Sequence, residues 1–256
     1  MIHVRQLVKA YEDPAAGKFV AVDSVTFDAL PGQIFGLLGP NGAGKTTVLR
    51  ILSTLLKPTS GLVSVNGYDT VADAEDVRRH LGFVSTNTAI YDRMTGWEMV
   101  RHFGRLYGMP ERILAERMEE LFERFHMGRC RNLLGGKMST GMKQKVSIAR
   151  AMVHDPPVLI FDEATSGLDI LAAREVLDTV QMLRDQGKCI VFSSHIMSEV
   201  KRICDYVAVM HRGRILATGT IQGLIEQYNQ NDLEELFYQL VSMDNSKPVL
   251  GKTGIA

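Results

Sequence analysis

The stretch Gly39–Thr47 reads GPNGAGKTT and carries residue types that can bind phosphate. Glycines allow backbone N–H groups to approach phosphate oxygens, Lys45 supplies a cation for the β and γ phosphates, and the Thr46 hydroxyl can ligate Mg²⁺. The helix that begins here adds the positive end of its dipole. A plain glycine-rich turn is the alternative, but the preceding QIFGLL favours a strand and the following TTVLRIL a helix. The predicted nucleotide contacts are Gly39, Pro40, Asn41, Gly42, Ala43, Gly44, Lys45, Thr46 and Thr47.

Two acids end a later apolar run, VLIFDE. A carboxylate at a strand end costs free energy to bury unless it meets a cation or a hydrogen-bond partner. We therefore expect Asp162 to hold Mg²⁺, directly or through water. Glu163 is expected to orient and deprotonate an attacking water, a role worth typically ~10²–10⁴ in rate. A strand-to-loop turn with solvated acids is the alternative interpretation.

His195 follows a further apolar run, in SSHIMSE. A lone histidine at such a position is often a helix cap or a packed residue. The order of the motifs places His195 at a strand end beside the same site, which favours contact with the γ-phosphate.

Residues 138–142, Met-Ser-Thr-Gly-Met, open another helix-like segment. The Ser139 hydroxyl can donate a hydrogen bond, Gly141 allows close backbone approach, and the helix from Thr140 presents its positive end. Taken alone, this stretch is a plain N-capped helix.

Short apolar runs must position these groups. Strand-like runs are KFVAVDSVTFDAL, QIFGLLG, GLVSVNG, LGFVS, VLIF, CIVFSS, YVAVM and ILATG. A helix is expected from Gly44 to about Leu56, and its apolar face comprises Val48, Ile51, Leu52 and Leu55. Further helices are expected over residues 170–185 and 196–203, with a short helical tail after about residue 221. Strands that alternate with helices predict an α/β core with a mostly parallel sheet covered on both faces.

The core is interrupted by a helical insertion, roughly residues 88–155. Thr95 and Glu98 fit a capping box that opens its first helix. Two further helices show helical spacing of apolar residues: Leu114, Met118, Leu121, Phe122 and Phe125 in one, and Met142, Val146, Ala149 and Val153 in the other.

The bulk composition is that of an ordinary globular protein. Of 256 residues, 45% are hydrophobic, and the formal net charge is zero, which gives no global attraction to nucleic acid. The three cysteines, Cys130, Cys189 and Cys204, fit reduced thiols better than a disulfide or zinc site. We expect no signal peptide and no run near the roughly 18 apolar residues that span a bilayer. Only the tail from Ser242 suggests disorder.

The order of these motifs over residues 1–220 resembles the nucleotide-binding subunit of ATP-binding cassette (ABC) transporters. The matching segments are Tyr11 for the adenine-stacking aromatic residue, 39–47 for Walker A, 139–142 for the signature, 159–163 for Walker B, 166–169 for the D-loop and His195 for the switch histidine. The resemblance implies a P-loop NTPase fold (ABC cassette) with a RecA-like parallel-sheet core, an N-terminal antiparallel β part and a helical insertion. It divides the chain into core residues 1–87 and 156–220, a helical subdomain 88–155 and a tail 221–256.

The resemblance also implies a mechanism and partners. Two copies of the chain would pack head to tail, with each ATP and its Mg²⁺ between the Walker A loop of one and Ser139 and Gly141 of the other. The pore would be a separate transmembrane permease, so the chain would lie on the cytoplasmic side of the cell membrane, and no nucleic acid is expected as a partner.

The sequence departs from the family pattern in three places. Thr140 replaces the usual glycine and Met142 the usual glutamine of the signature. Thr86 stands where relatives have a glutamine that reaches Mg²⁺, so Thr86 is a candidate metal ligand acting through water, with Asn87 as a substitute.

The stretches STNTAIYDRMTGWEMV and STGMKQKVSIARA are similar to the ATPase subunits of sodium-efflux (Nat-type) ABC exporters. This similarity implies export of a substrate, possibly Na⁺. The candidate permease contacts within residues 84–105 are Arg93, Met94, Trp97 and Phe103, although core packing explains Trp97 and Phe103 equally well.

Four other functions are alternatives for this sequence. A P-loop kinase or GTPase is disfavoured because no Asn-Lys-x-Asp motif is present. A soluble ABC ATPase acting on ribosomes or DNA is disfavoured, because such proteins usually carry two cassettes or a long coiled coil and this sequence shows neither. A regulatory cassette without turnover is disfavoured by Glu163 and His195. An exporter ATPase for a drug or another substrate remains open.

Overall fold

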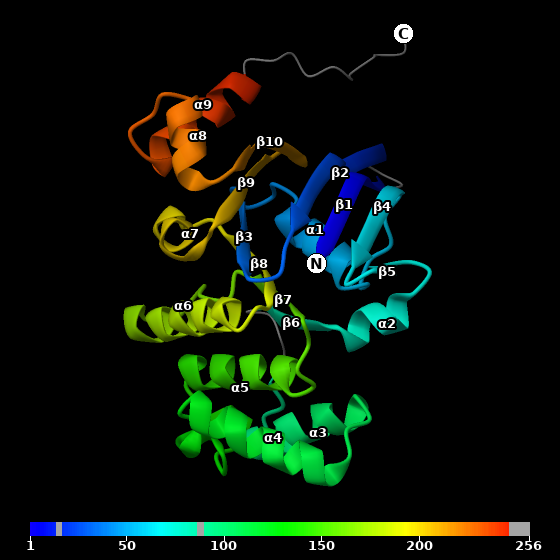
Figure 1. The fold of residues 1–256 in the computed structure, drawn as a ribbon, viewed down its shortest axis with the longest axis vertical. Helices are drawn as coiled ribbons and strands as arrows, with labels where there is room; N and C mark the ends of the chain where they lie inside the picture. Colours follow the sequence, from blue (N-terminus) through cyan, green and yellow to red (C-terminus); the bar gives the residue numbers. More distant parts are fainter. Residues whose placement is uncertain (14–16, 86–89, 246–256) are drawn as a thin grey trace.

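The computed structural model describes residues 1–13, 17–85 and 90–245, and its strands form two sheets. The smaller sheet has the order β2-β1-β4-β5, and all its pairs are antiparallel. Its strands are β1 (Ile2–Asp13), β2 (Gly17–Ala29), β4 (Ser60–Val65) and β5 (Tyr68–Asp69). This sheet is the predicted N-terminal antiparallel part, and in Figure 1 it lies beside the main sheet in blue and cyan.

The larger sheet has the order β10-β9-β3-β8-β7-β6 and is parallel except for the β9–β10 pair. Its strands are β3 (Gln33–Leu38), β6 (Leu81–Ser85), β7 (Val158–Asp162), β8 (Cys189–Ser194), β9 (Tyr206–His211) and β10 (Arg214–Gly219). Every residue of β7 and β8 is buried, as expected for central strands covered on both faces.

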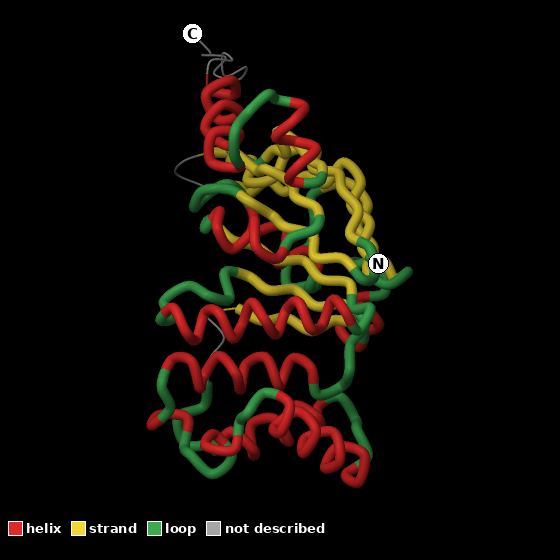
Figure 2. Tube along the Cα trace, turned by 60° about the vertical axis from the view of Figure 1, so that its left-hand side comes forward, coloured by secondary structure: helices red, strands yellow, loops and turns green. Residues whose placement is uncertain are grey.

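Helices surround this sheet and form a separate layer at one end of the molecule (Figures 1 and 2). The core helices are α1 (Lys45–Leu52), α2 (Ala74–Arg79), α6 (Ile170–Asp185), α7 (Met197–Ile203), α8 (Ile221–Gln227) and α9 (Leu233–Asn245). The end layer contains α3 (Gly96–Leu106), α4 (Glu111–Arg124) and α5 (Thr140–Met152), with the short 3₁₀ turns Gly128–Cys130 and Gly135–Lys137. The fold class predicted from the sequence is confirmed.

Apolar clusters join these layers. One cluster connects α3, α4, α5 and α6 to the sheet through Leu159, Phe161 and Phe192. A second packs α1 and the antiparallel sheet against the opposite face of the main sheet. A third places α8 and α9 over β9 and β10. Both faces of the parallel sheet are therefore covered. In open α/β sheets of this kind, ligands bind at the carboxyl ends of the strands.

The predicted capping box is present at α3, where the Thr95 hydroxyl accepts from the Glu98 N–H and the Glu98 carboxylate accepts from the Thr95 N–H. The helix from Gly44 is shorter than predicted and ends at Leu52. Thr54 takes a left-handed φ of 61°, which turns the chain out of the helix, so Leu55 is exposed rather than buried.

Three strands and helices were missing from the sequence prediction, one of which is the two-residue strand β5. Another is β1, whose pairing with β2 shifts register between Val4 and Ala10, so its apolar residues do not alternate cleanly. The third is the short helix α2. The prediction of disorder from Ser242 is wrong for residues 242–245, which continue α9. Among the described residues, no helix has the length and apolar character needed to cross a bilayer.

Candidate functional site

The phosphate loop lies between β3 and α1, at the carboxyl end of the parallel sheet. Gly42 and Gly44 have φ values of +82° and +102°, which favour glycine. Gly44 is the N-cap of α1 and makes no side-chain capping bond, so the described part of the chain offers no side chain to the first N–H groups of this helix. These N–H groups are available to an anion.

Lys45 is only 4% exposed and crosses the site. Its Nζ donates to Gly39 O at 2.7 Å and to Pro40 O at 3.2 Å, and lies 3.4 Å from Glu163 Oε1. A buried ammonium needs such acceptors. The protein therefore holds a cation at the mouth of the loop.

Two hydroxyl groups lie within hydrogen-bonding range of the carboxylate of Asp162, at the end of β7. Ser193 Oγ donates to Asp162 Oδ1 at 2.7 Å, and Thr46 Oγ1 lies 3.4 Å from the same oxygen. A hydroxyl and a carboxylate are hard oxygen ligands, and Mg²⁺ commonly takes one or two protein ligands while keeping several waters. The described residues contain no cluster of three or more His, Cys, Asp or Glu side chains. Thr46 and Asp162 thus fit Mg²⁺.

Glu163 lies between two basic side chains. Its Oε1 is 3.4 Å from Lys45 Nζ and 3.4 Å from His195 Nδ1. Its backbone φ is +49°, an uncommon conformation for a residue with a side chain, and its N–H donates to Ser193 O at 3.2 Å. Such strain clusters at functional sites because surrounding structure must hold it. Strand β8 thus holds the Glu163 backbone in place through Ser193.

A set of hydroxyl groups that was not predicted from the sequence ties the two strand ends together. Besides Ser193, the Ser194 and Thr165 hydroxyls both donate to Glu199 Oε2 at 2.9 Å. Serines at the end of the apolar strand CIVFSS were the available signal. These bonds connect the loop after β7 to helix α7, which follows His195.

A cavity of about 450 Å³ extends from the phosphate loop to the antiparallel sheet. Tyr11 and Phe19 line its outer end and face each other across the β1–β2 ladder. Lys9 Nζ lies 5.1 Å from the Tyr11 ring centroid. Tyr11 was predicted to contact adenine, whereas Phe19 was not singled out.

The predicted signature residues lie elsewhere. Ser139 is the N-cap of α5, and its Oγ accepts from the Met142 N–H at 3.3 Å. Among the described residues that line the phosphate-loop cavity, neither Ser139 nor Gly141 occurs. One chain therefore presents two separate helix N-termini, and the structure does not bring them together.

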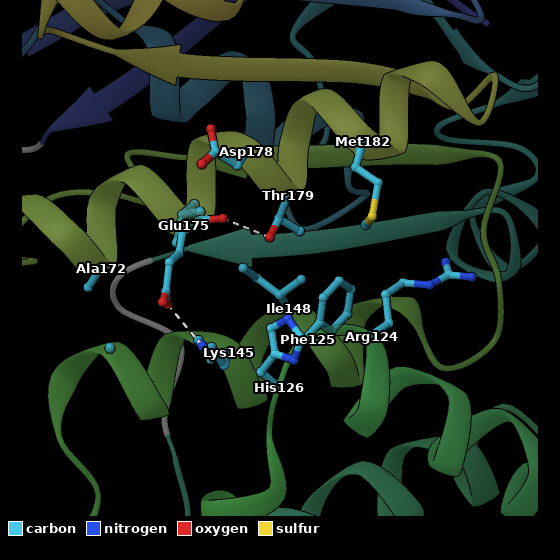
Figure 3. A pocket seen from close by; sticks show the side chains of 12 residues that line it. Arg124, Phe125, His126, Lys145, Ile148, Ala172, Glu175, Asp178, Thr179 and Met182 are labelled. Carbon is cyan, nitrogen blue, oxygen red and sulfur yellow. Dashed lines mark hydrogen bonds and ion pairs between the residues drawn. The ribbon is translucent and has the colours of Figure 1, made fainter.

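Helix α5 is anchored beside α6 (Figure 3). Lys145 Nζ and Glu175 Oε2 are 2.9 Å apart, and a cavity of about 310 Å³ lies between the two helices. A Cβ added to Gly141 would lie 3.1 Å from the Ala172 Cβ. The start of the signature helix is thus packed directly on the start of α6.

Three predicted permease contacts, Met94, Trp97 and Phe103, are partly buried and pack against the apolar core. Trp97 stacks edge-on against Phe122 at 5.0 Å and carries the Arg131 guanidinium 3.8 Å above its ring. Phe103 lies 4.9 Å beneath the Arg150 guanidinium. Core packing therefore accounts for both rings. The candidate metal ligand Thr86, with Asn87, falls outside the residues that the structure describes.

Comparisons with known proteins fit this geometry. The ABC transporter family matches residues 22–166. The ABC transporter ATP-binding protein NatA of Bacillus subtilis (strain 168) is 42% identical over 218 residues, which are 85% of this chain and 89% of NatA. The chain belongs to the ABC transporter family, and it is an ATPase that uses ATP with Mg²⁺.

Two solved structures share the fold. The structure of an ATP binding subunit of an ABC transporter superimposes with a TM-score of 0.84 at 31% identity and covers 94% of this chain and 99% of that one. The dimeric structure of MJ0796, a bacterial ABC transporter cassette, gives a TM-score of 0.78 at 25% identity over 86% of this chain and 98% of that one.

Proposed function

We propose that this chain is the ATP-hydrolysing subunit of an exporter, that two copies close around two MgATP, and that the cycle drives Na⁺ out through a separate membrane subunit. The main support for the dimer is that the N-termini of α1 and α5 are separated within one chain. The phosphate loop and Ser139 do not share a cavity in one chain. Two copies in reciprocal contact, related by twofold symmetry, could bring one of each to the same ATP.

The surface beside Ser139 supports this arrangement. Ile170 and Leu171 open helix α6 and are 88% and 75% exposed, although both are large and apolar. They directly precede Ala172, which packs on Gly141. A second copy that approaches Ser139 would cover them, which is favourable for apolar surface. The dimeric MJ0796 cassette is a relative that assembles as a pair.

The proposed roles follow from the distances. Thr46 and Asp162 would hold Mg²⁺, which neutralises phosphate charge when bound. Lys45 Nζ, now 3.4 Å from Glu163 Oε1, would also contact the γ-phosphate. Glu163 would direct a water in line at the γ-phosphorus and accept its proton, while His195 and the partner's helix start stabilise the charge that develops. Tyr11 would stack on adenine.

Sequence resemblance supports the proposed membrane partner and cargo. The Nat-type resemblance of residues 85–100 and 139–151 supports Na⁺ as the substrate. Arg93 and Met94 are the proposed permease contacts, which would place the chain on the inner face of the membrane. We also propose the four units 1–87, 88–155, 156–220 and 221–256 as its functional parts.

Mixing two inactive variants tests the shared site. Lys45→Ala disables the phosphate loop, and Ser139→Arg blocks the signature, so each homodimer has no working site. A heterodimer has one intact site. In it, the unchanged phosphate loop of the Ser139→Arg chain meets the unchanged Ser139 of the Lys45→Ala chain. We expect each variant alone to be inactive and the mixture to recover part of the ATPase rate. No recovery, with heterodimers shown to form, would reject the shared site.

The cargo needs a separate test. The chain and its permease would be placed in liposomes, and ATP-dependent movement of ²²Na⁺ would be compared with that of ⁸⁶Rb⁺ and of a cationic dye. Selective Na⁺ movement is expected. Movement of the dye alone would indicate a drug exporter.

A further inference from the structure

The turn between β9 and β10, residues 211–214, contacts the phosphate loop. The Gly213 N–H donates to Ala43 O at 3.0 Å, and a Cβ added to Gly39 would lie 2.4 Å from Met210 O, so the end of β9 is in close contact with the loop. Arg212 and Gly213 take φ values of 46° and 80°, which a tight hairpin turn requires.

The hydrogen bond to Ala43 O controls the direction of a phosphate-loop N–H group. Ala43 C=O and Gly44 N–H belong to one planar trans peptide, so the two bonds point in opposite directions. Holding the carbonyl toward Gly213 therefore turns the Gly44 N–H away from the turn. Ala43 and Gly44 both line the nucleotide cavity.

The same turn is held from the other side by the last helix, α9. His211 Nδ1 and Asp244 Oδ2 are 2.7 Å apart, and their side chains are only 12% and 14% exposed. The apolar face of α9, including Leu236 and Leu240, packs in a cluster with Leu38, the residue before Gly39. Helix α9 is thus linked to the region of the phosphate loop in two ways, by the polar His211–Asp244 pair and by the apolar cluster that includes Leu38.

We propose that His211 and Asp244 are positioning residues for ATP binding. Helix α9 fixes the β9–β10 turn through this pair, and the turn holds the Ala43–Gly44 peptide in the orientation that presents N–H to phosphate. A preorganised loop binds more tightly because it is ordered before the ligand arrives. The inference rests on the proposed nucleotide site, since the loop must be where phosphate binds.

The test compares Asp244→Ala with a control in the same helix. Asp232→Ala removes the hydrogen bond from the Glu235 N–H at the start of α9 but leaves the His211–Asp244 pair intact. We expect Asp244→Ala to raise the KM for ATP about fivefold, the effect of losing one hydrogen bond, with kcat within about twofold. Asp244→Asn keeps an acceptor for His211 and should bind like the parent. Asp232→Ala should lower the melting temperature without raising KM.

Amide hydrogen exchange gives a readout that general destabilisation does not mimic. The Gly213 N–H should exchange faster in Asp244→Ala than in Asp232→Ala at equal melting temperature. His211→Phe keeps a ring but loses the donor, so it should reproduce the KM rise if Asp244→Ala fails to fold.

Two outcomes would overturn the inference. One is an unchanged KM and unchanged Gly213 exchange in Asp244→Ala or His211→Phe. The other is an equal KM rise in Asp232→Ala. If the parent itself bound no ATP, the nucleotide site would fail; if the parent binds and Asp244→Ala binds equally well, only the positioning role fails.

Discussion

The Ser193 hydroxyl donates a 2.7 Å hydrogen bond to Asp162 Oδ1, the oxygen that also lies 3.4 Å from the Thr46 hydroxyl. Strand β8 therefore orients the carboxylate at the end of its neighbour β7. Ser193 is fully buried, and its backbone oxygen also accepts the Glu163 N–H. One serine thus supports both acids of the site.

Ser193→Ala should weaken the Mg²⁺ site. The carboxylate would lose the bond that fixes its orientation, and loss of such a supporting contact costs typically ~10–100-fold in metal affinity or activity. The Mg²⁺ concentration that gives half-maximal ATPase rate should therefore rise. Ser194→Ala is the matched control, because Ser194 bonds to Glu199 instead. An unchanged Mg²⁺ requirement would show that Ser193 is structural only.

Glu163→Gln should trap the closed dimer. The amide keeps the size of the side chain but is a poor base, so hydrolysis should fall by ~10²–10⁴ while ATP still binds. Light scattering on a sizing column with saturating MgATP should report a dimer. The double variant Lys45→Ala, Glu163→Gln should remain monomeric, since it lacks the phosphate cation. A monomeric Glu163→Gln chain at saturating ATP would contradict the proposed closure.

The substitution Gly141→Ala distinguishes two reasons why the signature has a glycine here: packing against α6, and close approach to the ATP of the partner chain. An added Cβ would lie 3.1 Å from the Ala172 Cβ, which is tight, and the same backbone is proposed to approach the partner's ATP. We expect the ATPase kcat/KM to fall by at least about tenfold, or about 1.4 kcal/mol. Adding Ala172→Gly relieves the internal contact. If the double variant regained full activity, packing on α6 would be the whole explanation.

His154 should make the fold sensitive to acid. Burial lowers the pKa of His154 to about 4, below its ordinary value of 6.5, and its ring stacks on Tyr107 with centroids 3.6 Å apart. Between these pH values the unfolded chain binds the proton and the folded chain does not, so stability is lost as pH falls from about 6.5 toward 4.

The test of this effect is His154→Phe, which keeps the ring stack without a titrating group. The parent should lose about 2 kcal/mol more unfolding free energy than the variant between pH 7.5 and pH 4.5. Urea unfolding at the two pH values measures this difference. Equal losses in the two proteins would show that His154 does not titrate as inferred.

Much of the fold could be predicted because its signals are local. Three consecutive segments show this: the strand that ends at Leu38, the glycines up to Gly44 and the helix from Lys45. Each of them is determined by the residue types within its own short segment. The Thr95–Glu98 capping box is similarly local. Strand β1 was missed because its bulges break the alternation of apolar residues, and those bulges depend on pairing with β2.

The supporting residues of the site could not be predicted in this way. Phe19 meets Tyr11 only through the register of two antiparallel strands, and Ser193 meets Asp162 only because β8 and β7 are parallel neighbours. The His211–Asp244 pair joins residues 33 positions apart. Their residue types are ordinary, and only the serines carried a signal in the sequence, because they end the apolar run CIVFSS.

The sequence by itself determined the order of the motifs, the alternation of strands and helices, and hence the family of this ATPase, because each motif is a short run whose residues act together. Tertiary structure alone decided that Glu163 lies between Lys45 and His195, and that Ser139 sits away from the phosphate loop of its own chain. Such relations depend on sheet order, register and helix packing, which sum many weak contacts between distant residues and leave no local trace in the chain.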